Sequence, residues 1–124
     1  MSSNATHRLA TASAGLETLL PTSEAEVMRI LWARGPLMVR AVYKEITKRR
    51  DIAYTTMTVC VRLAEKGLLR REKAAQSYGY VYTATIGEQD FVRRELAGIL
   101  DSIAREYPGA LAQYLDAQRE HGAV

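Results

Sequence analysis

Residues 67–83 read GLLRREKAAQSYGYVYT and predict a β-hairpin. Residues 68–73 have the composition of a strand, the small residues 74–77 are typical of a turn, and 78–83 alternate, with three tyrosines at a spacing of two. Because residues two apart lie on the same face of a strand, we expect at least two of these tyrosines to be core. Gly67 marks the end of a preceding helix, since glycine is favoured just after a helix C-terminus.

A helix with start and stop signals lies upstream of the hairpin. Ser23 and Glu26 form a capping box, in which each satisfies a helix N–H group that would otherwise lack a partner. Apolar residues follow at helical spacing, and Gly35-Pro36 is expected to end the helix near Arg34.

Two further helices are predicted between this helix and the hairpin. One spans about 39–49 and buries an apolar face that includes Val42 and Ile46. The other spans about 54–66, where Thr55 and Thr56 are suited to cap the N-terminus. Three helices followed by a hairpin are the element order of a winged helix-turn-helix, so we predict a mainly α fold with a small β-hairpin wing.

The residues after the hairpin predict a separate helical region. Thr85 and Glu88 form a second capping box, a long helix spans about 86–107, and a shorter one spans about 110–119. Their wide apolar faces need a covering surface, and a second copy of the chain supplies one. The alternative is that they fold back on the first region as ordinary core. The predicted dimerisation residues are Val92, Leu96, Ile99, Leu100, Ile103, Tyr107, Leu111 and Leu115.

Charge divides the chain in the same place. Residues 22–83 carry twelve Lys and Arg against six Asp and Glu, a net charge of +6. Residues 84–124 carry four against seven, a net charge of −3. A basic middle beside an acidic tail predicts that the middle faces a polyanion. Element order and charge together predict a module that binds double-stranded DNA.

The docking geometry of winged helices suggests a role for individual residues. One helix enters the major groove, where hydroxyls bond base edges, while the wing and nearby cations contact the backbone. Taken singly, these residues have plainer explanations, since a threonine pair at a helix start is more often a cap and a lone arginine is usually a solvated charge. The predicted DNA-binding residues are Tyr54, Thr55, Thr56, Thr58 and Arg62 in the third helix, Arg70, Arg71 and Lys73 in the wing, and Arg40 and Lys44 in the second helix.

Composition disfavours several other classes of protein. The chain has no run of 18 apolar residues that would span a membrane and no apolar block near its start, so we expect it to be cytoplasmic. One cysteine, Cys60, and two distant histidines predict neither a disulfide framework nor a metal site. We expect no cofactor and no enzyme activity, because no phosphate-binding loop and no nucleophile beside a base is present. Cys60 is interpreted as a packed small hydrophobe, with a redox switch as the alternative.

Residues 22–83 resemble the penicillinase-repressor family, the BlaI/MecI/CopY group of bacterial regulators. The resemblance implies a homodimer that represses transcription from a palindromic operator. In some members a membrane-bound sensor protease triggers cleavage of the repressor, and copper-responsive members carry paired cysteines in the tail, which this chain lacks. The matching residues are SEAEVMRILW at 23–32, Gly35-Pro36, Val39-Arg40, Ala53-Tyr54-Thr55-Thr56, Arg62-Leu63, Glu65-Lys66-Gly67-Leu68-Leu69 and Tyr80-Val81-Tyr82.

The third helix departs from the family pattern. Between Thr55-Thr56 and Arg62-Leu63 the family usually has one residue more, and one deleted residue rotates the preceding residues by about 100° around a helix. Either this helix begins later or recognition differs. Counting back from Leu63 gives a buried face of Leu63, Cys60, Val59 and Thr56, with Thr55, Thr58 and Val61 or Arg62 towards DNA.

These observations predict a sequence-specific DNA-binding repressor that acts as a homodimer. We expect a flexible leader over 1–21, a winged helix-turn-helix over 22–84 and a helical dimerisation domain over 85–124. The alternative for the leader is an arm that packs on a partner subunit or reaches DNA. The alternative functions are a winged-helix protein-interaction module without specific DNA binding and a nonspecific nucleoid protein.

Overall fold

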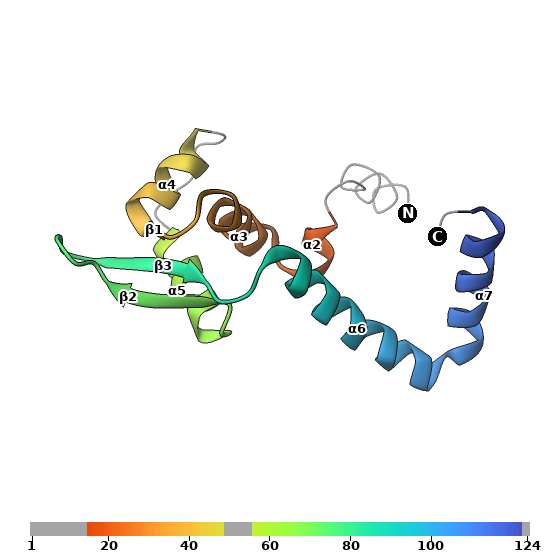
Figure 1. The fold of residues 1–124 in the computed structure, drawn as a ribbon. Helices are drawn as coiled ribbons and strands as arrows, with labels where there is room; N and C mark the ends of the chain where they lie inside the picture. Colours follow the sequence, from red (N-terminus) through yellow and green to blue (C-terminus); the bar gives the residue numbers. More distant parts are fainter. Residues whose placement is uncertain (1–14, 49–55, 123–124) are drawn as a thin grey trace. The chain divides into compact units, whose positions relative to one another are not determined.

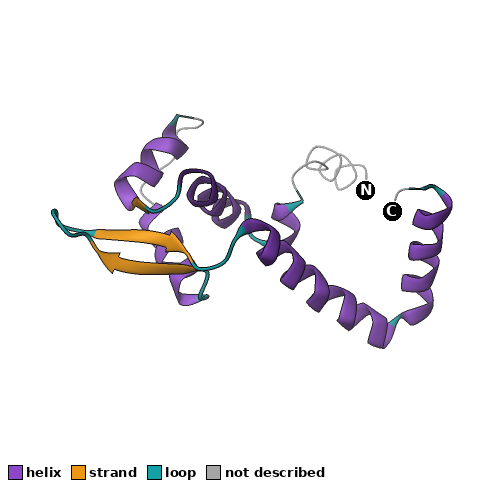
Figure 2. Ribbon diagram, viewed as in Figure 1, coloured by secondary structure: helices purple, strands orange, loops and turns teal. Residues whose placement is uncertain are grey.

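The computed structural model describes residues 15–48 and 56–122 and divides into two compact units, one ending at Glu88 and the other beginning at Gln89. The first unit holds helices α2 to α5 and a small antiparallel sheet (Figure 1). The second holds most of α6 and all of α7. Helices dominate, as Figure 2 shows, and the predicted winged-helix class with a helical C-terminal region is confirmed.

Three helices enclose the core of the first unit. They are α3 (Thr22–Arg34), α4 (Val39–Thr47) and α5 (Thr56–Glu65), and each packs against the other two. Side chains without any exposed surface include Met28 and Leu63. Apolar burial of this kind is the main favourable term in folding. It also positions α5, the helix predicted to contact DNA.

The predicted flexible leader is wrong for residues 16–20. Leu16–Leu19 form a short helix, α2, and both Leu16 and Leu20 are only 6% exposed. The Arg29 guanidinium on α3 donates to both oxygens of Glu17, at 2.5 and 3.0 Å. The leucines of this segment follow no clear helical period, so the sequence did not predict a helix here. Contact with α3 accounts for their burial.

Neither predicted capping box forms. Helix α3 begins at Thr22 behind Pro21, so Ser23 lies inside its first turn and caps nothing. The Thr85 hydroxyl instead donates to the Gly67 carbonyl at 2.7 Å, and α6 begins later, at Glu88. Each hydroxyl is thus displaced from the N-cap position, because each helix begins about two residues away from its predicted start.

The two glycine stop signals are confirmed. Gly35 ends α3 with φ +87°, and its N–H donates to the Leu31 carbonyl at 2.8 Å. Gly67 follows α5 with φ +84°, and the next N–H, of Leu68, donates to the Leu63 carbonyl at 3.0 Å. The left-handed conformation that closes a helix in this way favours glycine over other residues.

The hairpin forms as predicted, but it belongs to a sheet of three strands. Strands β2 (Leu69–Lys73) and β3 (Tyr80–Ala84) pair antiparallel, and β1 (Leu37–Met38) pairs with the other edge of β3. Sequence reasoning missed β1, because two residues between a helix stop and the next helix show no alternation.

The tyrosines of the hairpin are less buried than predicted. Tyr82 is core at 2% exposed, but Tyr80 is 44% exposed and Tyr78 is 97% exposed, so the expectation of two core tyrosines is wrong. Tyr78 precedes β3 at the distal turn, beyond the part of the hairpin that packs on the helices. A shared face is therefore not buried along its full length.

The tail forms the two predicted helices with slightly shifted ends. They are α6 (Glu88–Glu106) and α7 (Pro108–Glu120). Pro108 occupies the first turn of α7, where its missing N–H costs no hydrogen bond. None of the helices in the described ranges is both long and apolar enough to cross a membrane.

We predict that Leu20→Ala lowers the free energy of unfolding by about 2–5 kcal/mol, the usual cost of truncating a buried leucine. Urea denaturation measures this change. Leu19→Ala is the control, because Leu19 is partly exposed and its truncation should cost less. Equal and negligible losses in both variants would show that α2 does not pack on the core.

Candidate nucleic-acid interface

Helix α5 turns one face to the core and the other to solvent. Its buried residues are Thr56, Val59, Cys60 and Leu63, which confirms the face counted back from Leu63. Thr58 is exposed, as a base-reading residue must be, and Met57 beside it is 59% exposed. Tyr54 and Thr55 lie outside the described residues. The solvent face of α5 therefore presents Thr58 and Met57 near its N-terminus.

Thr56 is wrong as a DNA contact, because it is only 3% exposed. Its hydroxyl oxygen is buried and has no hydrogen-bond partner in the structure. Leaving a buried hydroxyl unsatisfied costs about 1–3 kcal/mol. This polar atom points to a role other than base contact.

A buried carboxylate ties α5 to α3. Glu24 is 1% exposed, and its side chain accepts a hydrogen bond from the Lys66 ammonium at 2.6 Å. The Arg62 guanidinium lies 3.6 Å from its other oxygen. Arg62, predicted to contact a phosphate, thus already neutralises a buried charge, although half of its side chain stays exposed.

The sequence held a signal for this carboxylate. Glu24 precedes Val27, Met28 and Leu31 by three, four and seven residues, so it lies on the same helix face as these buried side chains. A charge on an apolar stripe needs a partner. In this segment the sequence instead predicted a capping box formed by Ser23 and Glu26.

The wing presents cations on both of its faces. Arg71 lies opposite the buried Tyr82 on the core-facing side, and its guanidinium carbon is 4.3 Å from the centre of the Tyr80 ring. Arg70 points to the other side and pairs with Glu72 at 3.3 Å. Lys73 is exposed at the end of β2. The three predicted wing cations are therefore all accessible.

Helix α4 adds cations beside the wing. Arg40 and Lys44 are both exposed, whereas Lys48 pairs with Glu45 at 3.2 Å. Within residues 15–48 and 56–122, Arg40 and Lys44 form no ion pair, and neither do Arg71 and Lys73. Unpaired cations on α4 and the wing are the groups that release counterions when they meet phosphates.

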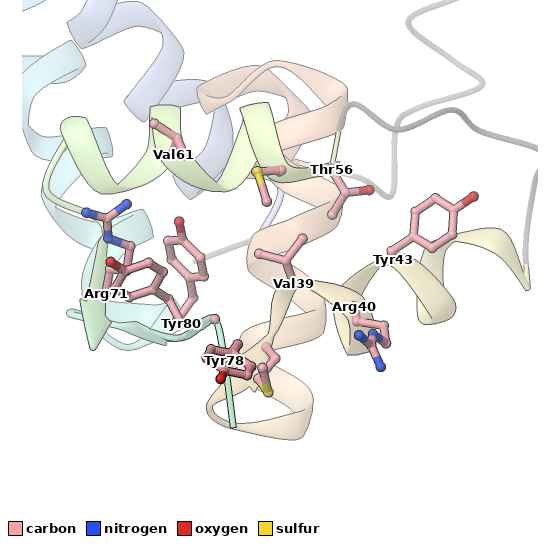
Figure 3. Close-up of a pocket in the computed structure, with 12 residues that line it drawn as sticks. Val39, Arg40, Tyr43, Thr56, Val61, Arg71, Tyr78 and Tyr80 are labelled. Carbon is pink, nitrogen blue, oxygen red and sulfur yellow. The ribbon is translucent and has the colours of Figure 1, made fainter. Parts of the chain in front are cut away.

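A cavity of about 500 Å³ lies between α5, the start of α4 and the wing. Its apolar walls include Met57 and Val61 of α5 and Tyr82 of β3. Figure 3 shows Arg71 and Tyr80 on one side of it and Arg40 and Tyr43 on the other. Arg40, Thr56 and Arg71, three of the residues predicted to bind DNA, line this cavity, which the sequence did not predict.

Burial disfavours redox chemistry at Cys60. The side chain is fully buried, and burial raises the pKa of its thiol to about 11. The thiol is therefore protonated at neutral pH, whereas the thiolate is the reactive form. No cluster of three or more His, Cys, Asp and Glu side chains suited to a metal occurs among the described residues.

The apolar faces of α6 and α7 are open in the single chain. Seven large apolar side chains on these helices or at the junction between them are between 37% and 60% exposed, and Val92 and Leu111 are half-buried. Contiguous exposed apolar surface marks interaction sites in soluble proteins. The seven are Leu96, Ile99, Leu100, Ile103, Tyr107, Tyr114 and Leu115.

Comparison with known proteins gives a family match over most of the chain. Residues 20–121 match the family model described as penicillinase repressor. A penicillinase repressor of Bacillus licheniformis is 31% identical over 90 residues, covering 72% of this chain and 66% of the relative. A transcriptional regulator BlaI of Mycobacterium tuberculosis is 43% identical over 65 residues, covering 51% and 47%. The chain thus spans at most about two thirds of the length of these relatives.

A solved structure shares the fold. The crystal structure of a transcriptional regulator aligns with 98% of this chain and 94% of its own, with a TM-score of 0.51 and 23% identity. An uncharacterized protein of Latilactobacillus sakei is also similar, at 31% identity over 99 residues, covering 78% of this chain and 66% of the relative.

We predict that Glu24→Gln lowers the free energy of unfolding by about 1–3 kcal/mol, because the buried negative charge that accepts a hydrogen bond from Lys66 and pairs with Arg62 is lost. Chemical denaturation monitored by circular dichroism reports this loss. Glu65→Gln on the exposed side of α5 is the matched control and should change stability little. If both variants unfolded alike, Glu24 would not hold α5 against α3.

Proposed function

Since the chain belongs to the penicillinase repressor family, we propose that it represses transcription by binding a palindromic operator as a homodimer. The observation that carries this proposal is the gathering of unpaired cations on α4 and the wing beside the exposed start of α5. In a winged helix these elements face the major groove and the adjacent backbone. The sensor protease and the cytoplasmic location suggested by the sequence stay predictions.

In this proposal, contacts to base edges and contacts to phosphates are made by different elements. Thr58 and Met57 on α5 reach base edges, where a hydroxyl can form hydrogen bonds and an apolar side chain can contact a thymine methyl group. The unpaired cations contact phosphates, which position the protein without reading sequence. They are Arg40 and Lys44 on α4 and Arg71 and Lys73 on the wing. Arg62 contributes less than predicted, because part of its charge is already engaged by Glu24.

The apolar faces of α6 and α7 support the homodimer. They are too wide for a solvated pair of helices, and a second copy offers an identical face. Two subunits joined in this way present two copies of α5 to two half-sites. Palindromic operators reflect such twofold symmetry.

We predict that replacing Arg70, Arg71 and Lys73 together by Ala lowers operator affinity at least about tenfold and flattens its salt dependence, because each lost phosphate contact removes about 0.9 from the log–log slope. Fluorescence anisotropy with promoter DNA measures both. Replacing Arg93, Arg105 and Arg119 by Ala is the control, since these cations lie on α6 and α7.

Unchanged affinity in the wing variant would contradict the proposal and favour the protein-interaction module. Equal binding of promoter and scrambled DNA would favour a nonspecific nucleoid protein.

We predict that Ile99→Asp with Ile103→Asp converts the dimer to a monomer, because two charges then interrupt the shared apolar face. Sedimentation equilibrium gives the mass directly. Arg105→Asp changes the net charge by the same −2 but lies on the side of α6 opposite Leu96, so it should stay dimeric. A double variant that remained dimeric would place the interface elsewhere.

A further inference from the structure

The cavity between α5 and the wing has the size and walls of a small-molecule site. Its volume of about 500 Å³ falls within the range of about 300–1,000 Å³ that is usual for ligand pockets. Tyr80 and Tyr82 come from β3, Met57 and Val61 from α5, and Val39 from α4. These walls are aromatic and aliphatic, which favours a flat apolar body over a solvated ion.

One polar group in the wall lacks a partner. Thr56 lines the cavity, is 3% exposed, and has a hydroxyl oxygen without a hydrogen bond in the structure. Most buried polar groups in proteins are hydrogen-bonded. The Thr56 oxygen is covered in this conformation. Rotation of the side chain would turn it towards the cavity, where a ligand can satisfy it.

Two cationic side chains line the cavity. Arg71 on the wing and Arg40 on α4 line it, and the described lining residues include no carboxylate (Figure 3). The Arg71 guanidinium rests over the Tyr80 ring, 4.3 Å from its centre, and this contact orients its donors. A guanidinium can bind a carboxylate through two parallel hydrogen bonds.

We infer that this cavity binds a planar aromatic carboxylate. The rings and aliphatic side chains contact its flat body, Arg71 binds its carboxylate, and the Thr56 hydroxyl supplies a further hydrogen bond once its side chain rotates the oxygen into the cavity. A neutral aromatic molecule leaves the guanidinia unmatched. A phosphodiester matches the cations but offers no apolar surface to contact the apolar walls.

Occupancy of the cavity would compete with DNA, a step that rests on the proposed function. Met57 lines the cavity and also lies beside Thr58 on the exposed side of α5. Tyr78, at the distal turn of the wing, lines the other end. A bound ligand therefore lies between the two elements that would contact the operator, and the aromatic carboxylate acts as an inducer.

Calorimetric titration of the full chain with 2-naphthoate, without DNA, tests the site. We expect 2-naphthoate to bind at least about tenfold more tightly than its neutral amide, 2-naphthamide, because only the acid forms a charged pair with Arg71. Arg71→Gln should weaken binding of 2-naphthoate about tenfold. Arg70→Gln is the matched control and should leave binding of 2-naphthoate unchanged, because Arg70 is the adjacent residue on the other face of β2 and does not line the cavity.

Thr56→Val separates ligand binding from folding. Removing the unpartnered hydroxyl without changing the side-chain shape should raise the unfolding temperature and still weaken binding of 2-naphthoate. Unfolding temperatures of all variants show that each is folded. Absence of 2-naphthoate binding, equal binding of acid and amide, or unchanged binding in Arg71→Gln would each overturn the site.

Anisotropy of promoter DNA with and without saturating 2-naphthoate tests the competition. Weaker DNA binding in its presence supports it, and unchanged DNA binding overturns the inducer role. Failure of the proposed function is distinguishable, because a chain that binds 2-naphthoate but no promoter DNA retains the site and loses the repressor role.

Discussion

The packing of α5 against α3 is the contact on which the rest of the structure depends. Val59, Cys60 and Leu63 bury one face of α5, and Glu24 of α3 binds Lys66 near its end. A helix turns about 100° per residue, so burying this face also decides which residues face solvent. The exposure of Thr58 and the burial of Thr56 both follow from this one packing arrangement.

A second constraint acts on the wing, because the helices cover only one end of the hairpin. Leu69 and Tyr82 pack into the core, whereas Tyr80 and Arg71 on the same face of the hairpin extend past it. Side chains on this uncovered stretch meet α5 across a hollow instead of packing against it. The same geometry that projects the wing outward therefore creates the cavity.

Local signals in the sequence predicted most of the fold. Glycine stops, helical periodicity and strand alternation each depend on a few neighbouring residues, and the structure confirms Gly35, Gly67, the hairpin and the two tail helices. The failures involve partners distant in the chain. Strand β1 exists because β3 pairs with it, and Leu16 and Leu20 are buried because α3 lies beside them.

The candidate site divides in the same way. The sequence by itself determined the family, the element order and which segments carry positive charge, because these depend on residue types and their spacing. Only the tertiary structure decided that Thr56 is buried and unpartnered, that Arg62 pairs with Glu24, and that Arg71 and Arg40 line one cavity. Each of these facts requires atoms from separate elements to meet, which is a consequence of packing and not of local pattern.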